Sequence, residues 1–131
     1  MGNKKICIYY VCNELSRRGW KCIQRKGKGK GFDIVISRDG KECPIKIKTL
    51  KDEERDLPFG SKDQFDNIIK NAKLVIVCTQ VNSGAPNIYI LTSEEVKQLS
   101  KASQTGTSFW LPKEIYLQFK NAWNKLNICQ D

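Results

Sequence analysis

Apolar residues at the start of the chain recur at helical spacing. Ile8, Val11, Cys12 and Leu15 follow the i, i+3, i+4, i+7 pattern of a helix with one buried face. This pattern predicts a helix over residues 4–18. The apolar runs that follow are shorter and alternate with polar residues, which is typical of strands. The strands are expected over residues 21–25, 32–37 and 42–50.

An Asp-Gly pair between the second and third of these strands predicts a tight hairpin. Side chains alternate between the two faces of a strand, so Ile45 and Ile47 are expected to share one face of the third strand. Lys46 and Lys48 are expected to share the other face. Across the hairpin, Asp33 is expected to lie close to both lysines.

The second half of the chain is predicted to alternate helices and strands. The expected elements are a loop over residues 51–60, a helix over 61–71, a strand over 74–78, a turn over 81–87, a strand over 88–91 and a helix over 92–99. Residues 100–108 are expected to be mobile, and a final helix is expected to run from Pro112 to about Leu126. This order predicts one α/β domain over residues 1–131, with a mixed central β-sheet flanked by helices.

The composition narrows the class of protein. Hydrophobic residues make up 40% of the chain and charged residues 28%, which excludes a disordered or membrane-spanning composition. No apolar run approaches the roughly 20 residues that a transmembrane helix needs. Residues 1–5 are polar and do not begin a secretory signal, so we expect a cytoplasmic protein without a membrane partner.

Six cysteines are spread along the chain without a Cys-x-x-Cys pair. They lie at positions 7, 12, 22, 43, 78 and 129. Most are surrounded by apolar residues, so they are expected to be small buried thiols in a reducing compartment. The chain has no histidine, which together with the cysteine spacing argues against a zinc site. The absence of histidine also excludes histidine-based catalytic triads.

Positive charge is concentrated in the first part of the chain. Residues 1–51 hold 14 Lys+Arg against 4 Asp+Glu, whereas the remaining residues hold 9 against 10. Such an asymmetry indicates a polyanionic partner, and we expect nucleic acid, with DNA before RNA. The residues expected to contact it are Arg25, Lys26, Lys28 and Lys30, in and beside a Gly-Lys loop, and Lys46. The alternative is a basic surface that is merely solvated.

Three stretches resemble a known superfamily. Residues 10–20 (YVCNELSRRGW), 31–36 (GFDIVI) and 45–49 (IKIKT) are similar to small bacterial members of the PD-(D/E)XK nuclease superfamily. The similarity is tightest over residues 8–50 and looser to about residue 97. It implies the restriction-endonuclease-like fold, an element order of αβββαββαα, and Mg²⁺-dependent cleavage of phosphodiesters.

The resemblance also implies roles for individual residues. Asp33 would be the metal-binding aspartate, Lys48 the catalytic lysine, and Glu14 the helix glutamate that some members add to the metal site. In such chemistry the carboxylates bind Mg²⁺, which generates the attacking hydroxide, and the lysine stabilises the transition state. The structural alternatives are that Glu14 pairs with an arginine of its own helix and that the two strand lysines are solvated.

The chain departs from the family pattern at Lys46, where the family has Glu, Asp or Gln as the second metal ligand. An ammonium group offers no lone pair and repels a divalent cation. We therefore expect a nucleic-acid-binding protein of this fold whose cleavage is weak or lost, with Mg²⁺ as cofactor only if it is active.

Two other functions stay open. The first is an active Mg²⁺-dependent endonuclease that uses Asp33, Glu14 and Lys48. The second is a catalytically dead interaction module, of the inhibitor or immunity type, that contacts a protein partner through residues 52–56 and 109–111. The formation of a homodimer also stays open.

Overall fold

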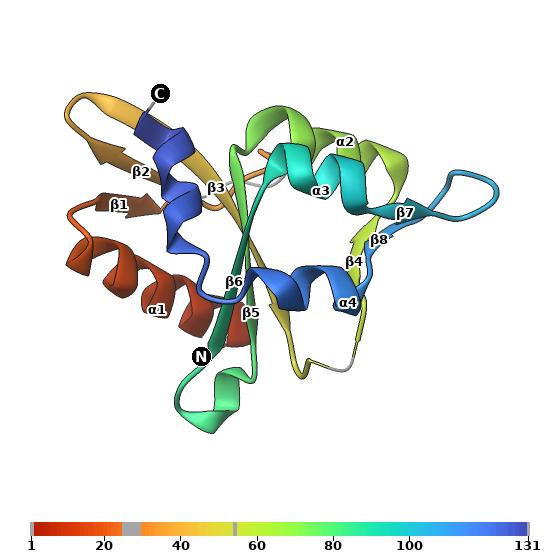
Figure 1. The fold of residues 1–131 in the computed structure, drawn as a ribbon, viewed down its shortest axis with the longest axis horizontal. Helices are drawn as coiled ribbons and strands as arrows, with labels where there is room; N and C mark the ends of the chain where they lie inside the picture. Colours follow the sequence, from red (N-terminus) through yellow and green to blue (C-terminus); the bar gives the residue numbers. More distant parts are fainter. Residues whose placement is uncertain (1, 25–29, 54, 131) are drawn as a thin grey trace.

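The computed structural model describes residues 2–24, 30–53 and 55–130 (Figure 1). The first half contains α1 (Asn3–Arg17), β1 (Lys21–Gln24), β2 (Ile34–Arg38), β3 (Lys41–Leu50), β4 (Leu57–Gly60) and α2 (Lys62–Asn71). The second half contains β5 (Leu74–Thr79), η1 (Val81–Ser83), β6 (Asn87–Thr92), α3 (Ser93–Leu99), β7 (Lys101–Ala102), β8 (Phe109–Leu111), α4 (Lys113–Tyr116), η2 (Leu117–Phe119) and η3 (Trp123–Gln130).

A five-stranded mixed sheet forms the centre of the fold, as the sequence predicts. Its strand order is β1-β2-β3-β5-β6. β3 and β5 are parallel, and the other neighbours are antiparallel. The hairpin predicted between β2 and β3 is confirmed, with Arg38 opposite Lys41. Asp39 and Gly40 form its turn, both at positive φ.

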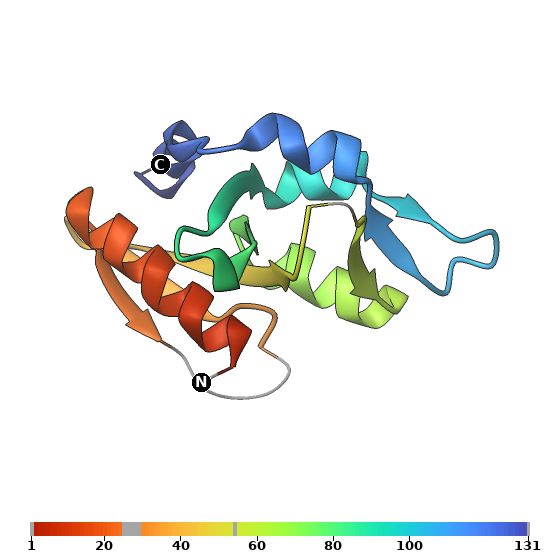
Figure 2. The ribbon, with the colours of Figure 1, turned by 90° about the horizontal axis from the view of Figure 1, so that it is seen from below.

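Helices cover both faces of this sheet (Figures 1 and 2). On one face, Val11 and Leu15 of α1 pack in a cluster with Ile45 and Ile47 of β3. On the other face, α2, α3 and α4 pack over the side chains that point the opposite way, such as Val75 of β5. All six residues of β5 are buried, so the strand predicted over residues 74–78 is a central strand covered on both faces.

Two segments that the sequence presents as loops form a second sheet instead. β4 lies within the predicted loop 51–60, and it pairs with β8, which pairs with β7. Leu57 and Phe59 alternate with the exposed Pro58 and are buried, so β4 has the strand pattern on a short scale. The apolar side chains of this sheet, including Leu111, complete the core around α2.

The segment 100–108 is a hairpin that projects from the molecule (Figure 2). The amide of Ser103 donates to the carbonyl of Ser108, and the amide of Gly106 donates to Ser103. These bonds close a turn between β7 and β8, and the mobility expected of this segment stays a prediction. The contact surface expected at residues 109–111 is only partly exposed, because Phe109 and Trp110 are half-buried. Leu111 is buried and the Phe109 ring stacks on Phe65.

The predicted final helix is broken into α4, η2 and η3. The break lies at Asn121, which has a φ of 52° and donates its amide to the carbonyl of Ile88 in β6. Before the break, Tyr116 packs on the α2 side of the sheet, whereas after it Leu126 packs with α1. The segment therefore crosses the β6 edge, and one straight helix could not cover both faces.

The prediction of six free thiols is wrong for four of them. The structure pairs Cys12 with Cys22, between α1 and β1, and Cys43 with Cys129, between β3 and η3. Cys7 and Cys78 are buried free thiols, as expected. Because four cysteines are paired, the cysteines no longer support the expectation that the protein resides in a reducing compartment.

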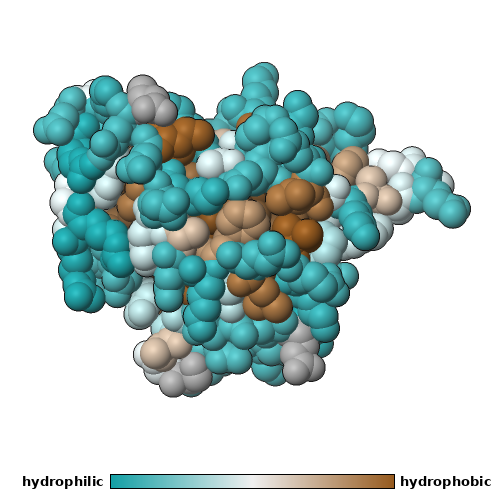
Figure 3. Space-filling model, in the orientation of Figure 1, coloured by the Kyte–Doolittle hydropathy of each residue, from teal (hydrophilic) through white to brown (hydrophobic). Residues whose placement is uncertain are grey.

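None of the helices in the described part of the chain is long and apolar enough to cross a membrane. The face drawn in Figure 3 is hydrophilic over most of its area, with apolar side chains gathered near its middle.

Candidate functional site

Asp33 precedes β2 and is held in place by the backbone of β3. Its amide donates to the carbonyl of Ile45 at 2.9 Å, and its carboxylate accepts from the amide of Ile47 at 2.7 Å. Two ammonium groups also approach this carboxylate. Lys4 Nζ lies 2.9 Å from one oxygen, and Lys46 Nζ lies 3.6 Å from the other. Both carboxylate oxygens therefore face a lysine.

Lys46 and Lys48 point to the face of β3 that is covered by α2. Both line an open pocket of about 210 Å³. Its walls are Gly31, Lys46, Lys48, Phe59, Gln64, Asn67 and Ile68. Lys48 Nζ lies 5.6 Å from the centre of the Phe59 ring, a favourable distance for a cation over an aromatic face. We call Lys4, Lys46, Lys48 and Asp33 the lysine cluster.

The wall opposite the lysines depends on where α2 begins. Ser61 caps α2. Its hydroxyl accepts from the amide of Gln64, and the Gln64 side chain accepts from the Ser61 amide. This capping box fixes the first turn of α2 beside the pocket. Gly31 has a φ of 76°, and a Cβ atom there would meet the carbonyl oxygen of Asn67 at 2.5 Å. Only glycine allows the chain to pass so close to α2.

Lys46 and Lys48 both have a lowered pKa. Burial, and then the charges of Lys46 and Lys4, lower the pKa of Lys48 to about 8, against a weaker opposing effect of Asp33. Burial also lowers the pKa of Lys46, with Lys4 adding to the effect and Asp33 opposing it. Three like charges that share one carboxylate leave an excess of positive charge, which an anion can neutralise.

Lys4 is the member of the cluster that the sequence did not point to. It lies in the first turn of α1, far along the chain from Asp33, and its side chain is 47% exposed. No local motif marks it. Lys4 lies at the N-terminal end of a helix that packs on the sheet. Its proximity to Asp33 can be predicted only when the packing of that helix is known.

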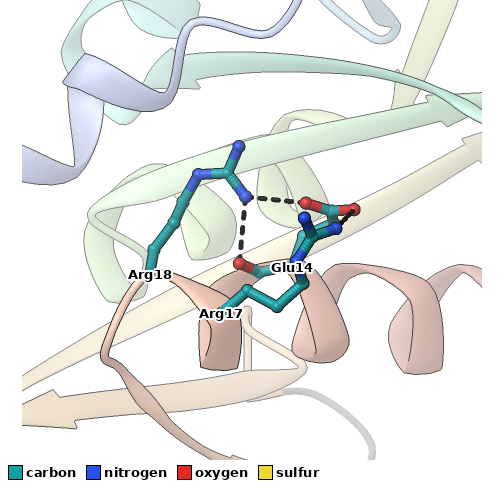
Figure 4. A network of polar contacts seen from close by, with 3 residues as sticks. All are labelled: Glu14, Arg17 and Arg18. Atoms are coloured by element: carbon teal, nitrogen blue, oxygen red, sulfur yellow. Dashed lines mark hydrogen bonds and ion pairs between the residues drawn. The ribbon is translucent and has the colours of Figure 1, made fainter.

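Glu14 lies away from this cluster. On α1 it follows Lys4 by ten residues, which corresponds to about 15 Å along the helix axis. Its carboxylate accepts from Arg18 at 2.7 Å and from Arg17 at 3.3 Å (Figure 4). The Arg18 guanidinium lies 4.0 Å from the ring centre of Trp123. Glu14 therefore has the role that the sequence left as its structural alternative, an ion pair within its own helix.

The predicted nucleic-acid contacts are only partly described. Arg25, Lys26 and Lys28 lie outside the described residues. Lys30 is exposed and directly precedes Gly31 at the pocket wall. Lys46 lies within the pocket. Of the predicted site residues, the structure thus brings together Asp33, Lys46 and Lys48, with Lys30 near their pocket.

The residues of this cluster do not fit a divalent metal. Magnesium prefers oxygen ligands, and a protein site supplies them mainly through carboxylates. Here one carboxylate is shared by two ammonium groups and a backbone amide. Within residues 2–24, 30–53 and 55–130, no three His, Cys, Asp or Glu side chains are grouped closely enough to hold a metal ion. The arrangement suits a phosphate or another anion better.

Several solved structures have a similar fold, and two of them show the extent of the similarity. The Holliday junction resolvase Hjc of Archaeoglobus fulgidus superposes with a TM-score of 0.66 and 16% identity, over 95% of this chain and 96% of that chain. The bacterial homing endonuclease I-Ssp6803I superposes with a TM-score of 0.63 and 12% identity, over 95% and 90%. No family model and no curated protein sequence matches the chain. The structural likeness confirms the restriction-endonuclease-like fold.

Proposed function

We propose that this chain, which has the restriction-endonuclease-like fold, binds nucleic acid through the lysine cluster and cleaves it weakly or not at all. The observation that most supports this proposal is that two lysines surround Asp33. Lys4 Nζ lies 2.9 Å from one carboxylate oxygen and Lys46 Nζ lies 3.6 Å from the other. The cluster then offers ammonium groups to a phosphate, and it offers no free pair of carboxylates to a metal.

The charge distribution supports a nucleic-acid ligand. The excess of Lys and Arg lies within residues 1–51, which supply all four members of the lysine cluster. Phosphate backbones carry closely spaced negative charges, and basic surfaces bind them with release of counterions. DNA is favoured over RNA because a Holliday junction resolvase and a homing endonuclease are among the structural neighbours.

An active Mg²⁺-dependent endonuclease is the less favoured alternative. A metal ion at Asp33 would have to displace Lys4 and approach Lys46, whose charge repels it. Glu14 would have to leave both arginines and move along the length of α1. These costs favour binding without efficient cleavage.

The proposal predicts DNA binding that weakens steeply with salt. We would titrate labelled duplex DNA with the protein at several salt concentrations and compare wild type with Lys46→Ala. Loss of one phosphate contact is expected to make the slope of log K against log salt shallower by about one. Lys101→Ala is the matched control, since Lys101 is exposed on β7 outside the cluster. Equal slopes for wild type and Lys46→Ala would contradict a phosphate contact at the cluster.

A further inference from the structure

We propose that the Lys48 amine forms an imine with the aldehyde of an abasic nucleotide in bound DNA, so that the chain recognises abasic sites covalently. This inference rests on the proposed nucleic-acid binding and assigns separate roles within the lysine cluster. Lys4 and Lys46 bind phosphate, and Lys48 reacts.

The geometry distinguishes Lys48 from the other two lysines. Lys4 and Lys46 both form ion pairs with Asp33, and an ion pair stabilises the protonated, unreactive ammonium. In the part of the chain that the structure describes, Lys48 has no ion-pair partner, and the only contact that favours its ammonium there is the weaker one with the Phe59 ring, 5.6 Å away. Lys48 also lines the open pocket, and it is only partly buried.

The surroundings of Lys48 supply the neutral amine that such a reaction needs. A lysine becomes nucleophilic when burial or a neighbouring cation lowers its pKa, and both act here. With a pKa of about 8, about a tenth of the Lys48 side chains are neutral at pH 7. An ordinary surface lysine is almost fully protonated at that pH.

The pocket suits a sugar that has lost its base. It is open, has a volume of about 210 Å³, and carries the side-chain amides of Gln64 and Asn67 opposite the lysines. The Gln64 side-chain oxygen accepts from the Ser61 amide, so its amide nitrogen is the group that can donate to a sugar hydroxyl. Turning a nucleotide out of a duplex costs least where pairing and stacking are already lost, which is the case at an abasic site. Lys46 can meanwhile contact a flanking phosphate.

The chemistry balances without an oxidant or a metal. In its open form the abasic deoxyribose carries an aldehyde at C1′. The lone pair of the Lys48 nitrogen attacks this carbonyl carbon, and the amine proton moves to the carbonyl oxygen. A carbon–nitrogen double bond then forms as the hydroxyl takes the second amine proton and leaves as water. One amine and one aldehyde give one imine and one water.

The test is borohydride trapping on duplex DNA with a single abasic site, because borohydride reduces an imine to a stable secondary amine. We expect a covalent adduct with wild-type protein and at least a tenfold lower yield with Lys48→Arg, which keeps the charge and removes the primary amine. Lys101→Arg is expected to react like wild type. Peptide mass spectrometry of the wild-type adduct should place the deoxyribose on Lys48.

A second duplex separates this inference from the proposed function. It carries a tetrahydrofuran in place of the abasic sugar, so it can be bound and cannot form an imine. Binding of this duplex without an adduct on the abasic duplex, or an adduct that maps to other lysines, would overturn the role of Lys48 and leave nucleic-acid binding intact. Failure of wild type to bind the tetrahydrofuran duplex at low salt would overturn the proposed function itself.

Discussion

One side chain decides what the neighbourhood of Asp33 can bind. With a carboxylate at position 46 the site would pair two acids. With Lys46 it pairs one acid with Lys4 and Lys46, at 2.9 and 3.6 Å. The sequence predicted the proximity of Asp33, Lys46 and Lys48 correctly because a two-strand hairpin fixes its own register.

At the residue scale, the lowered pKa of Lys48 predicts that the stability of the fold depends on pH. Its pKa is about 8 in the folded chain and 10.5 when unperturbed. Between these values the unfolded state binds more protons than the folded state, so the free energy of unfolding rises with pH over this window. Urea unfolding at pH 7.5 and 9.5 should show the rise in wild type and a smaller one in Lys48→Met. If the free energy of unfolding rises equally in the variant, groups other than Lys48 cause the pH dependence.

Asp33→Asn tests the charge balance of the lysine cluster. The amide oxygen can still accept from the Ile47 amide, while the negative charge that offsets three lysines is lost. DNA binding at low salt is expected to tighten about fivefold, which corresponds to about 1 kcal/mol. Thermal stability in the absence of DNA is expected to fall, because the lysines then repel one another without compensation. Weaker DNA binding by a folded variant would argue against an anion at this position.

At the element scale, the pocket depends on the close approach between Gly31 and α2. Gly31→Ala should destabilise the fold by about 2 kcal/mol or more, since the backbone is left-handed and the new Cβ meets the Asn67 carbonyl. Gly40→Ala is the matched control, with a φ of 78° and open space around it. The difference between the two variants in urea unfolding measures the steric part. Equal losses of stability in the two variants would mean that the chain near Gly31 can shift to make room for the new Cβ.

The elements also show where sequence reasoning ends. Strands and caps were predictable wherever the signal was local, as in the buried run of β5 or the capping box at Ser61. β4 was missed because four residues show too little alternation, and its partner β8 lies far along the chain. The C-terminal segment kept helical spacing on both sides of Asn121, and spacing alone does not say that its two halves cover different faces.

At the scale of the whole molecule, the restriction-endonuclease-like fold positions the lysine cluster and its pocket. The sheet and its helices bring distant residues together: Lys4 comes from α1, Lys48 from β3, and Asn67 from α2. The pairing of Cys12 with Cys22 and of Cys43 with Cys129 was equally a long-range property, and it could not be deduced from spacing. In the function that we propose, this framework binds a phosphate of nucleic acid without hydrolysing it efficiently.

The most direct test is to incubate the purified protein with labelled duplex DNA at low salt, with and without Mg²⁺, and to separate the products on native and denaturing gels. We expect a retarded complex on the native gel and intact strands on the denaturing gel under both conditions. Mg²⁺-dependent cleavage by wild type that is lost in Asp33→Ala would contradict the account, because it would mean that Asp33 holds a metal despite Lys4 and Lys46.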